Sequence, residues 1–256
     1  MFEDLIGKSA LITGGARGLG LGMAQALAGC GVHVGLVDIL DSVEQSARKV
    51  ADEYNVTSVA VIADLTDQRQ VVRAFDEVEA GLGAPVDILV NSAGVSVFAD
   101  AIDISPEQWQ RVMDINLGAT WACAQIQAQR SRDRGRAASI INIASMSSFI
   151  VNVPQHQTAY NVSKAAVSML TKCLAVEWLP LQIRVNAIAP GYFASDITRQ
   201  FTDQNPELGR EWVSRIPLGR MGEPPELGGL VAYLASDESS YVVGQSYVID
   251  GGFTIV

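Results

Sequence analysis

Short apolar runs alternate with longer amphipathic segments along almost the whole chain. Each run has the length of a buried strand and is followed by glycine or polar residues. The runs occupy residues 9–13, 32–37, 58–63, 87–90, 139–144, 184–189 and 247–250. Most segments between them carry apolar residues at the three- and four-residue spacings of helices that cover a sheet. This alternation predicts an α/β fold in which a parallel sheet of about seven strands is doubly wound.

The first apolar run leads into a glycine-rich loop that opens the next helix. Gly14, Gly18 and Gly20 lie in this loop, directly after the strand. Glycines allow a tight turn and let the backbone approach a pyrophosphate, while the helix N-terminus offers free N–H groups and a positive dipole end. Strand, glycine turn and helix in this order predict a dinucleotide site.

A second group of chemically active residues precedes and opens the helix after the fifth run. Tyr160 and Lys164 are four residues apart and should therefore share one helix face. A neighbouring ammonium lowers the pKa of a phenol from its usual value of about 10. We therefore expect a general acid or base near neutral pH. Ser145 ends the preceding strand and should lie close by.

Six motifs in order resemble the short-chain dehydrogenase/reductase family. They are TGGARGLG (13–20), NSAG (91–94), Asn116, Ser145, YNVSK (160–164) and PGYFAS (190–195). The resemblance covers essentially the whole chain, including the closing IDGGF. It implies one Rossmann-type domain spanning residues 1–256. It also implies a homotetramer, assembled through the helix of Tyr160 and through the last strand.

The resemblance assigns catalytic roles to Asn116, Ser145, Tyr160 and Lys164. Tyr160 would exchange a proton with the substrate, and Lys164 would hold the nicotinamide ribose and lower the pKa of Tyr160. Ser145 would bond the substrate oxygen, whereas Asn116 would bend its helix and hold a water linked to Lys164. Ser147 and Ser148 are also near the strand end, but the alignment with the family favours Ser145.

The expected cofactor residues follow the carboxyl ends of the strands, where ligands of such sheets bind. Asp64 would contact the adenine amino group, or else cap the helix that begins near Asp67. Residues 190–195 match a turn that binds the carboxamide. The full set is Gly14, Arg17, Gly18, Leu19, Gly20, Asp38, Asp64, Leu65, Asn91, Ala93, Gly94, Tyr160, Lys164, Pro190, Gly191, Phe193 and Ser195.

Two residues give opposite indications about the cofactor. Asp38 ends the second strand, where a carboxylate can bond both adenosine ribose hydroxyls and repel a 2′-phosphate. Arg17 lies in the glycine loop, where a basic residue receives that phosphate in NADP-using relatives. The repulsion between an unpaired carboxylate and a phosphate costs more free energy than leaving an arginine without a phosphate to bind. We therefore predict that the cofactor is NAD.

The segment between Ser145 and Tyr160 indicates the substrate class. It resembles that of family members acting on sugar alcohols, of the galactitol, arabinitol or mannitol type. We expect Ser145, Ser147, Asn152 and Tyr160 to bind substrate, and Gln155 and His156 could read further hydroxyls. The segment 196–211 is long, polar and weakly patterned, and fits a mobile lid. The prediction is hydride transfer between NAD and a polyol or sugar.

Two alternatives stay open. An NADPH-dependent 3-oxoacyl-carrier-protein or other carbonyl reductase is also compatible with the motifs, and gluconate 5-dehydrogenases are near. A 3-oxoacyl-carrier-protein reductase would need a basic patch to bind its acidic carrier protein. The chain offers four clustered arginines for such a patch: Arg130, Arg132, Arg134 and Arg136. A dinucleotide-binding sensor without turnover is less compatible, because the serine, tyrosine and lysine are all retained.

Composition narrows the partners and the compartment. The net charge of −10 argues against nucleic acid and anionic membranes. Three cysteines, Cys30, Cys123 and Cys173, lack metal-ligand spacing, so we expect no metal in the active centre and a reducing cytoplasm. No signal peptide or membrane-spanning run is evident. The apolar tail GGFTIV should pack at a subunit interface, although a structural ion there stays open.

Overall fold

The computed structural model describes residues 2–256, except for the side chains of residues 196, 197 and 200. Its centre is a parallel sheet of seven strands in the order β3-β2-β1-β4-β5-β6-β7. The strands are β1 (Ser9–Thr13), β2 (His33–Asp38), β3 (Ser58–Ile62), β4 (Ile88–Asn91), β5 (Ala138–Ile143), β6 (Ile183–Pro190) and β7 (Ser246–Ile249). The predicted doubly wound sheet is therefore confirmed, with strand ends within about two residues of expectation.

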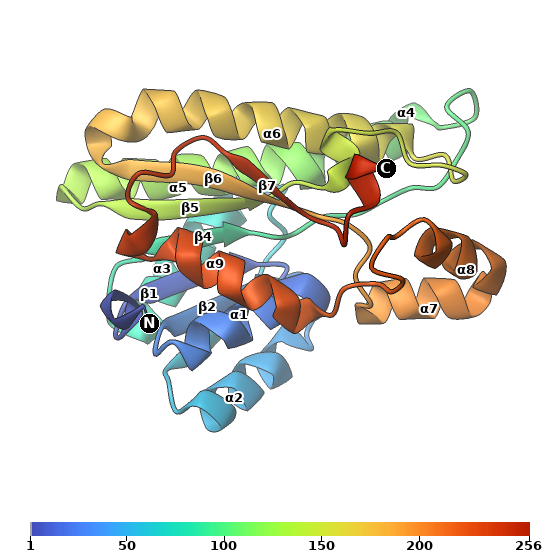
Figure 1. Ribbon diagram of the computed structural model, residues 1–256. Coiled ribbons are helices and arrows are strands. Elements are labelled where there is room, and N and C mark those ends of the chain that lie inside the picture. The colour runs from blue at the N-terminus through green and yellow to red at the C-terminus, as the bar shows by residue number, and fades with distance from the viewer. Residues whose placement is uncertain (1) are drawn as a thin grey trace.

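Helices cover both faces of this sheet (Figure 1). One face carries α1 (Gly18–Gly29), α2 (Val43–Tyr54) and α9 (Gly228–Ala235). The other carries α3 (Gln68–Leu82), α5 (Ala119–Arg134) and α6 (Thr158–Trp178). Three further helices, α4 (Pro106–Met113), α7 (Asp196–Gln204) and α8 (Pro206–Ser214), lie at the margin of the sheet.

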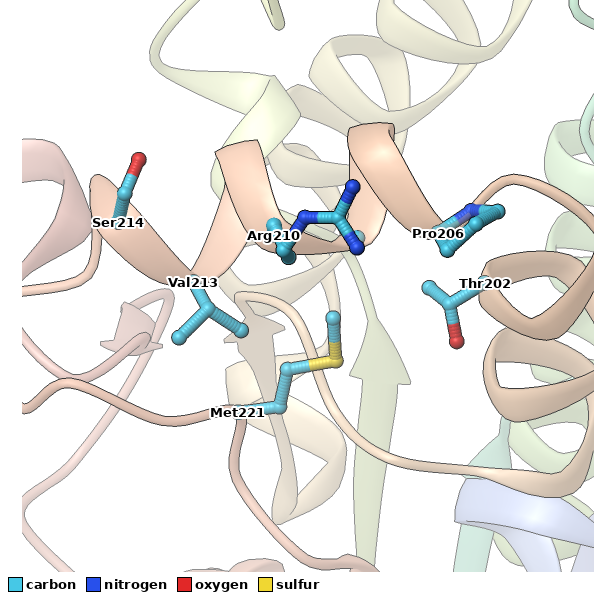
Figure 2. A pocket seen from close by; sticks show the side chains of 7 residues that line it. Thr202, Pro206, Arg210, Val213, Ser214 and Met221 are labelled. Carbon is cyan, nitrogen blue, oxygen red and sulfur yellow. The ribbon is translucent and has the colours of Figure 1, made fainter.

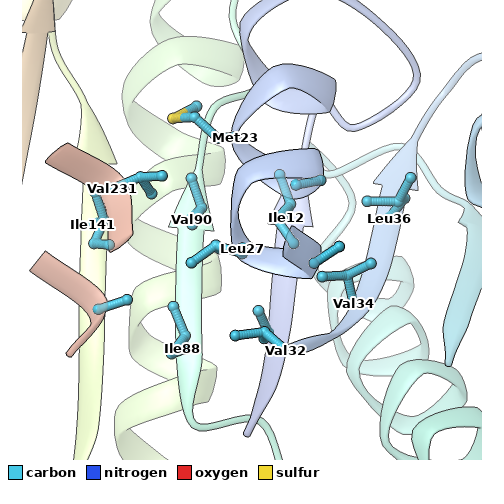
Figure 3. Packing of buried hydrophobic residues seen from close by; sticks show 14 of the residues in the cluster. Ile12, Met23, Leu27, Val32, Val34, Leu36, Ile88, Val90, Ile141 and Val231 are labelled. Carbon is cyan, nitrogen blue, oxygen red and sulfur yellow. The ribbon is translucent and has the colours of Figure 1, made fainter. Parts of the chain in front are cut away.

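The central strands β1, β4 and β5 are buried along their whole length. Figure 3 shows Leu27 of α1 and Val231 of α9 packed against Ile12, Val90 and Ile141 of three neighbouring strands. All five side chains are inaccessible to solvent. Burying such side chains contributes about 1.5–3 kcal/mol each, which is why β1, β4 and β5 carry continuous apolar runs.

The strand order reverses between β1 and β4. From β1 the chain builds outward to β2 and β3, then crosses back to start β4 on the other side of β1. The connections after β1 and β4 therefore diverge and leave a crevice at the carboxyl ends of these strands. The glycine loop after β1 and the NSAG segment after β4 both lie at this crevice.

The long helical segment predicted from Pro106 onward is interrupted in its middle. Residues Asp114–Gly118 form a π-helical turn between α4 and α5, in which the N–H of Ala119 donates to the carbonyl of Asp114. Such turns are rare and recur at functional sites. Asn116 lies at the centre of this turn, so the helix departs from regular geometry where the resemblance implied.

The segment expected to form a lid is more regular than its pattern indicated. It forms α7 and α8, separated at Asn205. The Ser195 hydroxyl accepts from the N–H of Thr198 and so caps α7, while Pro206 begins α8. The apolar pattern is weak because only a few residues anchor these exposed helices. No helix within residues 2–256 has the length and hydropathy needed to cross a bilayer.

Candidate active site

A cleft of about 730 Å³ opens at the carboxyl ends of the strands. Residues from the glycine loop, the ends of β2 to β6, the start of α6 and the lid helices line it. Its wall includes the predicted residues Gly14, Arg17, Gly18, Leu19, Gly20, Asp38, Asp64, Leu65, Ala93, Gly94, Ser145, Ser147, Asn152, Tyr160, Lys164, Pro190, Gly191, Phe193 and Ser195. Parts of the chain predicted separately therefore meet in one cavity.

A second hollow of about 500 Å³ lies between α7, α8 and the segment around Met221 (Figure 2). Its lining consists of Thr202, Pro206, Gly209, Arg210, Val213, Ser214 and Met221. None of these is a predicted site residue. The larger cleft is therefore the candidate active site.

The glycine loop is closed so tightly that side chains would not fit. A Cβ atom on Gly20 would lie 2.1 Å from the carbonyl oxygen of Gly14, and Gly14 itself has a φ of +66° and packs on the backbone of Ala93. Within the described residues, no side chain caps the start of α1. The first N–H groups of this helix thus stay available to an anion, as a pyrophosphate site requires.

Asp38 is tied to the glycine loop by its own carboxylate. One oxygen accepts from the N–H of Ala16 at 3.0 Å and the other from the N–H of Leu40 at 3.1 Å. These bonds hold the half-buried carboxylate at the end of β2, beside the cleft. Arg17 lines the same cleft and is exposed.

The two acids after β3 have different roles in the structure. Asp67 caps α3, accepting from the N–H of Arg69 at 2.9 Å. Asp64 instead bonds the backbone and hydroxyl of Thr66 and lines the cleft. Asp64 is therefore not the helix cap, and its carboxylate lies in the cleft wall after β3.

The structure does not bring the side chain of Asn91 to the cleft. This amide is buried within the sheet and donates to Asn142 Oδ1 at 2.9 Å and more weakly to the carbonyl of Thr120. The cleft wall is formed instead by the next residues, whose backbone N–H groups at 92 and 93 donate to Thr13 Oγ1. The Asn91 side chain joins β4 to β5, so a cofactor contact at this predicted residue would involve its backbone.

Asn116 joins three segments of the site. Its Oδ1 accepts from the N–H of Val95 at 2.8 Å, and its Nδ2 donates to the carbonyl of Val95 and to Ser163 Oγ, both at 2.9 Å. A Cβ atom on Gly94 would lie 3.3 Å from Asn116 Oδ1 and 3.5 Å from Lys164 Nζ. Asn116 and Lys164 thus approach each other across a residue that has no side chain.

Lys164 and Tyr160 lie on the same side of the first turns of α6. The buried Lys164 ammonium donates to the carbonyl of Ile143 at 2.7 Å and lies 5.8 Å from the centroid of the Tyr160 ring. Burial lowers the pKa of Lys164 to about 8, since a desolvated ammonium is less stable.

The pKa of Tyr160 differs from the expected direction. Burial raises the pKa of this phenol, the Ser145 hydroxyl opposes the rise, and the neighbouring Tyr192 phenol adds to it. Lys164 is not among the causes, so the predicted lowering by Lys164 is corrected for this structure. The physical reason is that burial of the phenol, which disfavours its charged form, is the largest influence on this pKa. The phenol is therefore protonated at neutral pH.

The three serines after β5 are distinguished by their contacts. Ser145 Oγ donates to Ser147 Oγ at 3.0 Å, and Ser147 Oγ donates to Asn152 Oδ1 at 2.6 Å. Ser148 Oγ turns to the backbone carbonyl of Lys164 and does not line the cleft. Of the three serines, Ser145 is the one whose hydroxyl lowers the pKa of Tyr160. Ser147 is hydrogen-bonded to Ser145.

The polar residues of the loop before α6 divide between two environments. Asn152 and Gln155 line the cleft, as does Gln157. His156 is exposed and pairs with Asp100, so it joins two loops outside the cleft. Of the three loop residues singled out from the sequence, His156 is the one that the structure excludes from the site.

Four aromatic residues complete the cleft wall and were not predicted. Phe98 stacks on Phe201 at 4.9 Å between ring centroids, Phe201 on Trp212 at 5.5 Å, and Trp212 on Tyr192 at 4.4 Å. All four line the cleft. Phe201 and Trp212 are large apolar residues in an otherwise polar segment, and this contrast is the sequence signal that could have revealed them.

Replacing Gly20 with alanine should weaken dinucleotide binding, because the new methyl group overlaps the Gly14 carbonyl and forces the loop to shift. Backbone strain of about 1–3 kcal/mol predicts a loss of roughly tenfold or more in affinity. Quenching of protein fluorescence by NADH measures it. Gly29→Ala, at the other end of the same helix, is the control, because its Cβ would make only ordinary contacts at 3.6 Å. Equal affinities for the two variants would contradict the assignment.

Comparison with known proteins identifies the family of this chain. The family model described as Enoyl-(Acyl carrier protein) reductase matches residues 14–254. Galactitol 2-dehydrogenase (L-tagatose-forming) of Cereibacter sphaeroides is 38% identical over 252 residues, which cover 98% of this chain and 96% of that protein.

Solved structures extend the comparison. A short-chain type dehydrogenase/reductase from Mycobacterium marinum superposes with a TM-score of 0.93 at 39% identity, covering 100% of this chain and 98% of that one. The NADPH-dependent 3-quinuclidinone reductase from Rhodotorula rubra gives 0.89 at 33% identity, covering 98% and 93%. With the sheet order and the cleft described above, these matches establish that the chain belongs to the short-chain dehydrogenase/reductase family and is an oxidoreductase of that family.

Proposed function

We propose that this protein transfers a hydride between NAD(H) and a secondary alcohol or ketone of a polyol or sugar. The observation that carries the proposal is the meeting of Ser145, Tyr160 and Lys164 in one cleft with the glycine loop. Residues 1–256 would act as a single domain, with the dinucleotide along the strand ends and the substrate under α7 and α8.

The proposed chemistry depends on proton transfer at the Tyr160 oxygen. Bound NAD would accept or supply the hydride. Tyr160 would donate its proton to a ketone oxygen, or accept the proton of an alcohol in the reverse direction. Ser145 would hold that same oxygen by a hydrogen bond. Lys164 would bond the nicotinamide ribose. Asn116 would hold the backbone of Val95 near Lys164.

The pH dependence should differ between the two directions. Oxidation needs the Tyr160 phenolate, and burial raises the pKa of this group, so the rate of alcohol oxidation should increase with pH through the alkaline range. Ketone reduction needs the phenol, so its rate should fall as pH passes the same pKa. Rates across pH in both directions measure this, and Tyr160→Phe should lose about 100-fold or more in both. Parallel profiles for both directions would contradict the role of Tyr160.

The proposed preference for NAD rests on the fixed position of Asp38. Hydrogen bonds from two backbone N–H groups keep the carboxylate beside the glycine loop. A 2′-phosphate at this place would meet a negative charge that is held in position.

Initial rates with a panel of polyols, with NAD and NADP in parallel, test both the reaction and the cofactor. The wild-type protein should oxidise polyols and prefer NAD. Asp38→Asn should lower the ratio of kcat/KM for NAD over NADP by about tenfold or more, because the repulsive charge is removed. Asp41→Asn, at an exposed acid just beyond the site, is the matched control. A wild-type preference for NADP would overturn the assignment and favour a role for Arg17.

The proposed substrate class rests on the mixed character of the cleft wall. Hydroxyl and amide groups of Ser147, Asn152 and Gln155 line the same cleft as an aromatic surface that includes Trp212. Polar groups placed in this way bond the hydroxyls of a ligand, while aromatic faces pack on its carbon chain. The likeness to a galactitol 2-dehydrogenase supports the same class.

The carrier-protein alternative loses its main support. The arginines that could have formed a docking patch are paired with acids: Arg130 with Asp76 and Glu79, Arg132 with Asp133, Arg134 with Glu79, and Arg136 with Asp87. Asp87 directly precedes β4, so this cluster reaches the amino-terminal end of the sheet, opposite the cleft. A carrier bound there would be at the wrong end to deliver its thioester.

We propose that the protein acts in the cytoplasm as a homotetramer. The surface of α6 exposes Val162, Met169 and Val176, at 42%, 58% and 76% of their full areas and at seven-residue spacing. Val248 of β7 and Ile255 of the tail are also exposed, at 40% and 83%. Apolar surfaces of this kind are typical of subunit interfaces. Light scattering should give four times the chain mass of 27.3 kDa, and a monomer would contradict the proposal.

A further inference from the structure

Tyr192 stands in the cleft wall between the catalytic serine loop and the lid. It lies in the turn after β6, and its phenol oxygen accepts hydrogen bonds from two amides. Gln155 Nε2 donates at 2.7 Å and Asn152 Nδ2 at 3.3 Å. The role of this residue is not explained by the family motifs, which assign the turn to the cofactor.

The orientation of the Gln155 amide is fixed by an indole. Trp212 Nε1 donates to Gln155 Oε1 at 3.0 Å, and an indole N–H can only donate. The amide oxygen of Gln155 must therefore face Trp212, and its NH₂ group must face Tyr192. The Tyr192 oxygen is consequently the acceptor in this bond.

The Asn152 amide is oriented in a similar way. Its Oδ1 accepts from Ser147 Oγ at 2.6 Å and from Gln157 Nε2 at 3.0 Å. Because Asn152 Oδ1 faces Ser147 and Gln157, the NH₂ group of Asn152 faces Tyr192. Both lone-pair positions of the Tyr192 oxygen are thus occupied by N–H donors, and its own proton has no acceptor among them.

The Tyr192 ring is fixed as firmly as its oxygen. It stacks on Trp212 with a centroid distance of 4.4 Å and an interplanar angle of 11°, and Phe253 packs against it edge-on at 5.4 Å. Burial raises the pKa of Tyr192, so the phenol keeps its proton. The Tyr192 O–H is therefore a hydrogen-bond donor whose position is fixed by the residues around it. Selective recognition of a ligand requires donors that are held in this way.

We propose that Tyr192 is a specificity-determining residue, which donates a hydrogen bond to a second oxygen of the substrate. It shares the cleft wall with Ser145 and Tyr160, where the first oxygen would react. Gln155 and Trp212 also position Tyr192, through the hydrogen bonds that run from the indole to the amide and from the amide to the phenol. The proposal rests on the proposed function and deepens it, because it selects vicinal diols and hydroxyketones over alcohols with a single oxygen.

The test compares two substrates in one assay. A four-carbon vicinal diol and the four-carbon secondary alcohol differ only in the second oxygen. Tyr192→Phe keeps the ring and its stacking but removes the donor, so the ratio of kcat/KM for the diol over the alcohol should fall by about tenfold or more. Trp212→Phe keeps an aromatic ring but frees the Gln155 amide, and it should lower the same ratio by a smaller factor. Tyr241→Phe, at a fully exposed tyrosine, is the control.

The outcomes separate the two proposals. An unchanged ratio in Tyr192→Phe, or an equal loss of kcat/KM for both substrates, overturns the role of Tyr192 while the proposed function stands. A wild-type protein that oxidises neither substrate nor any polyol with either cofactor overturns the proposed function, and the Tyr192 proposal with it.

Discussion

The amide side chain of Asn116 is the constraint on which the catalytic end of the cleft depends. It bonds both backbone groups of Val95 and the hydroxyl of Ser163, so it holds together the segment after β4, the π-helical turn and α6. An unpaired polar group in this buried place would cost about 1–3 kcal/mol, which ties the three segments to one arrangement. Lys164 lies one residue beyond Ser163 and is therefore placed by the same contacts. The departure from regular helix at Asn116 allows a helix-borne amide to reach a loop and a second helix at once.

Burial makes the charge on Lys164 sensitive to its surroundings, because it lowers the pKa of this group. Its pKa of about 8 leaves the ammonium only modestly favoured at neutral pH, with the Ile143 carbonyl as its acceptor. The phenol of Tyr160 remains protonated under the same conditions. A ligand that offers oxygen atoms near Lys164 would compete with the Ile143 carbonyl for the ammonium and so change the field at Tyr160. The electrostatics of this site therefore depend on what the cleft holds.

The sequence was informative where signals are local and less so where they are not. Strands and the Tyr160–Lys164 pair follow from periodicity and spacing, and their positions in the structure agree with the predictions. The position of Asn91 could not be read in this way, since its amide is directed inward by Asn142, which lies on another strand. The stacked aromatics form only when Phe98, Tyr192, Phe201 and Trp212 are brought together from four segments of the chain. The direction of the Tyr160 pKa shift likewise depends on burial, which no motif encodes.

The hydrogen bond from the N–H of Ala16 to the Asp38 carboxylate gives this carboxylate two roles. The same carboxylate that would discriminate between cofactors also holds the loop that would receive the pyrophosphate. A substitution of Asp38 therefore changes the support of the glycine loop together with the charge at the end of β2. A change there alters the shape of the glycine loop as well as its charge, so the effects of Asp38 and loop substitutions will be non-additive. A substitution that removes the Asp38 carboxylate therefore also needs a replacement acceptor for the N–H of Ala16.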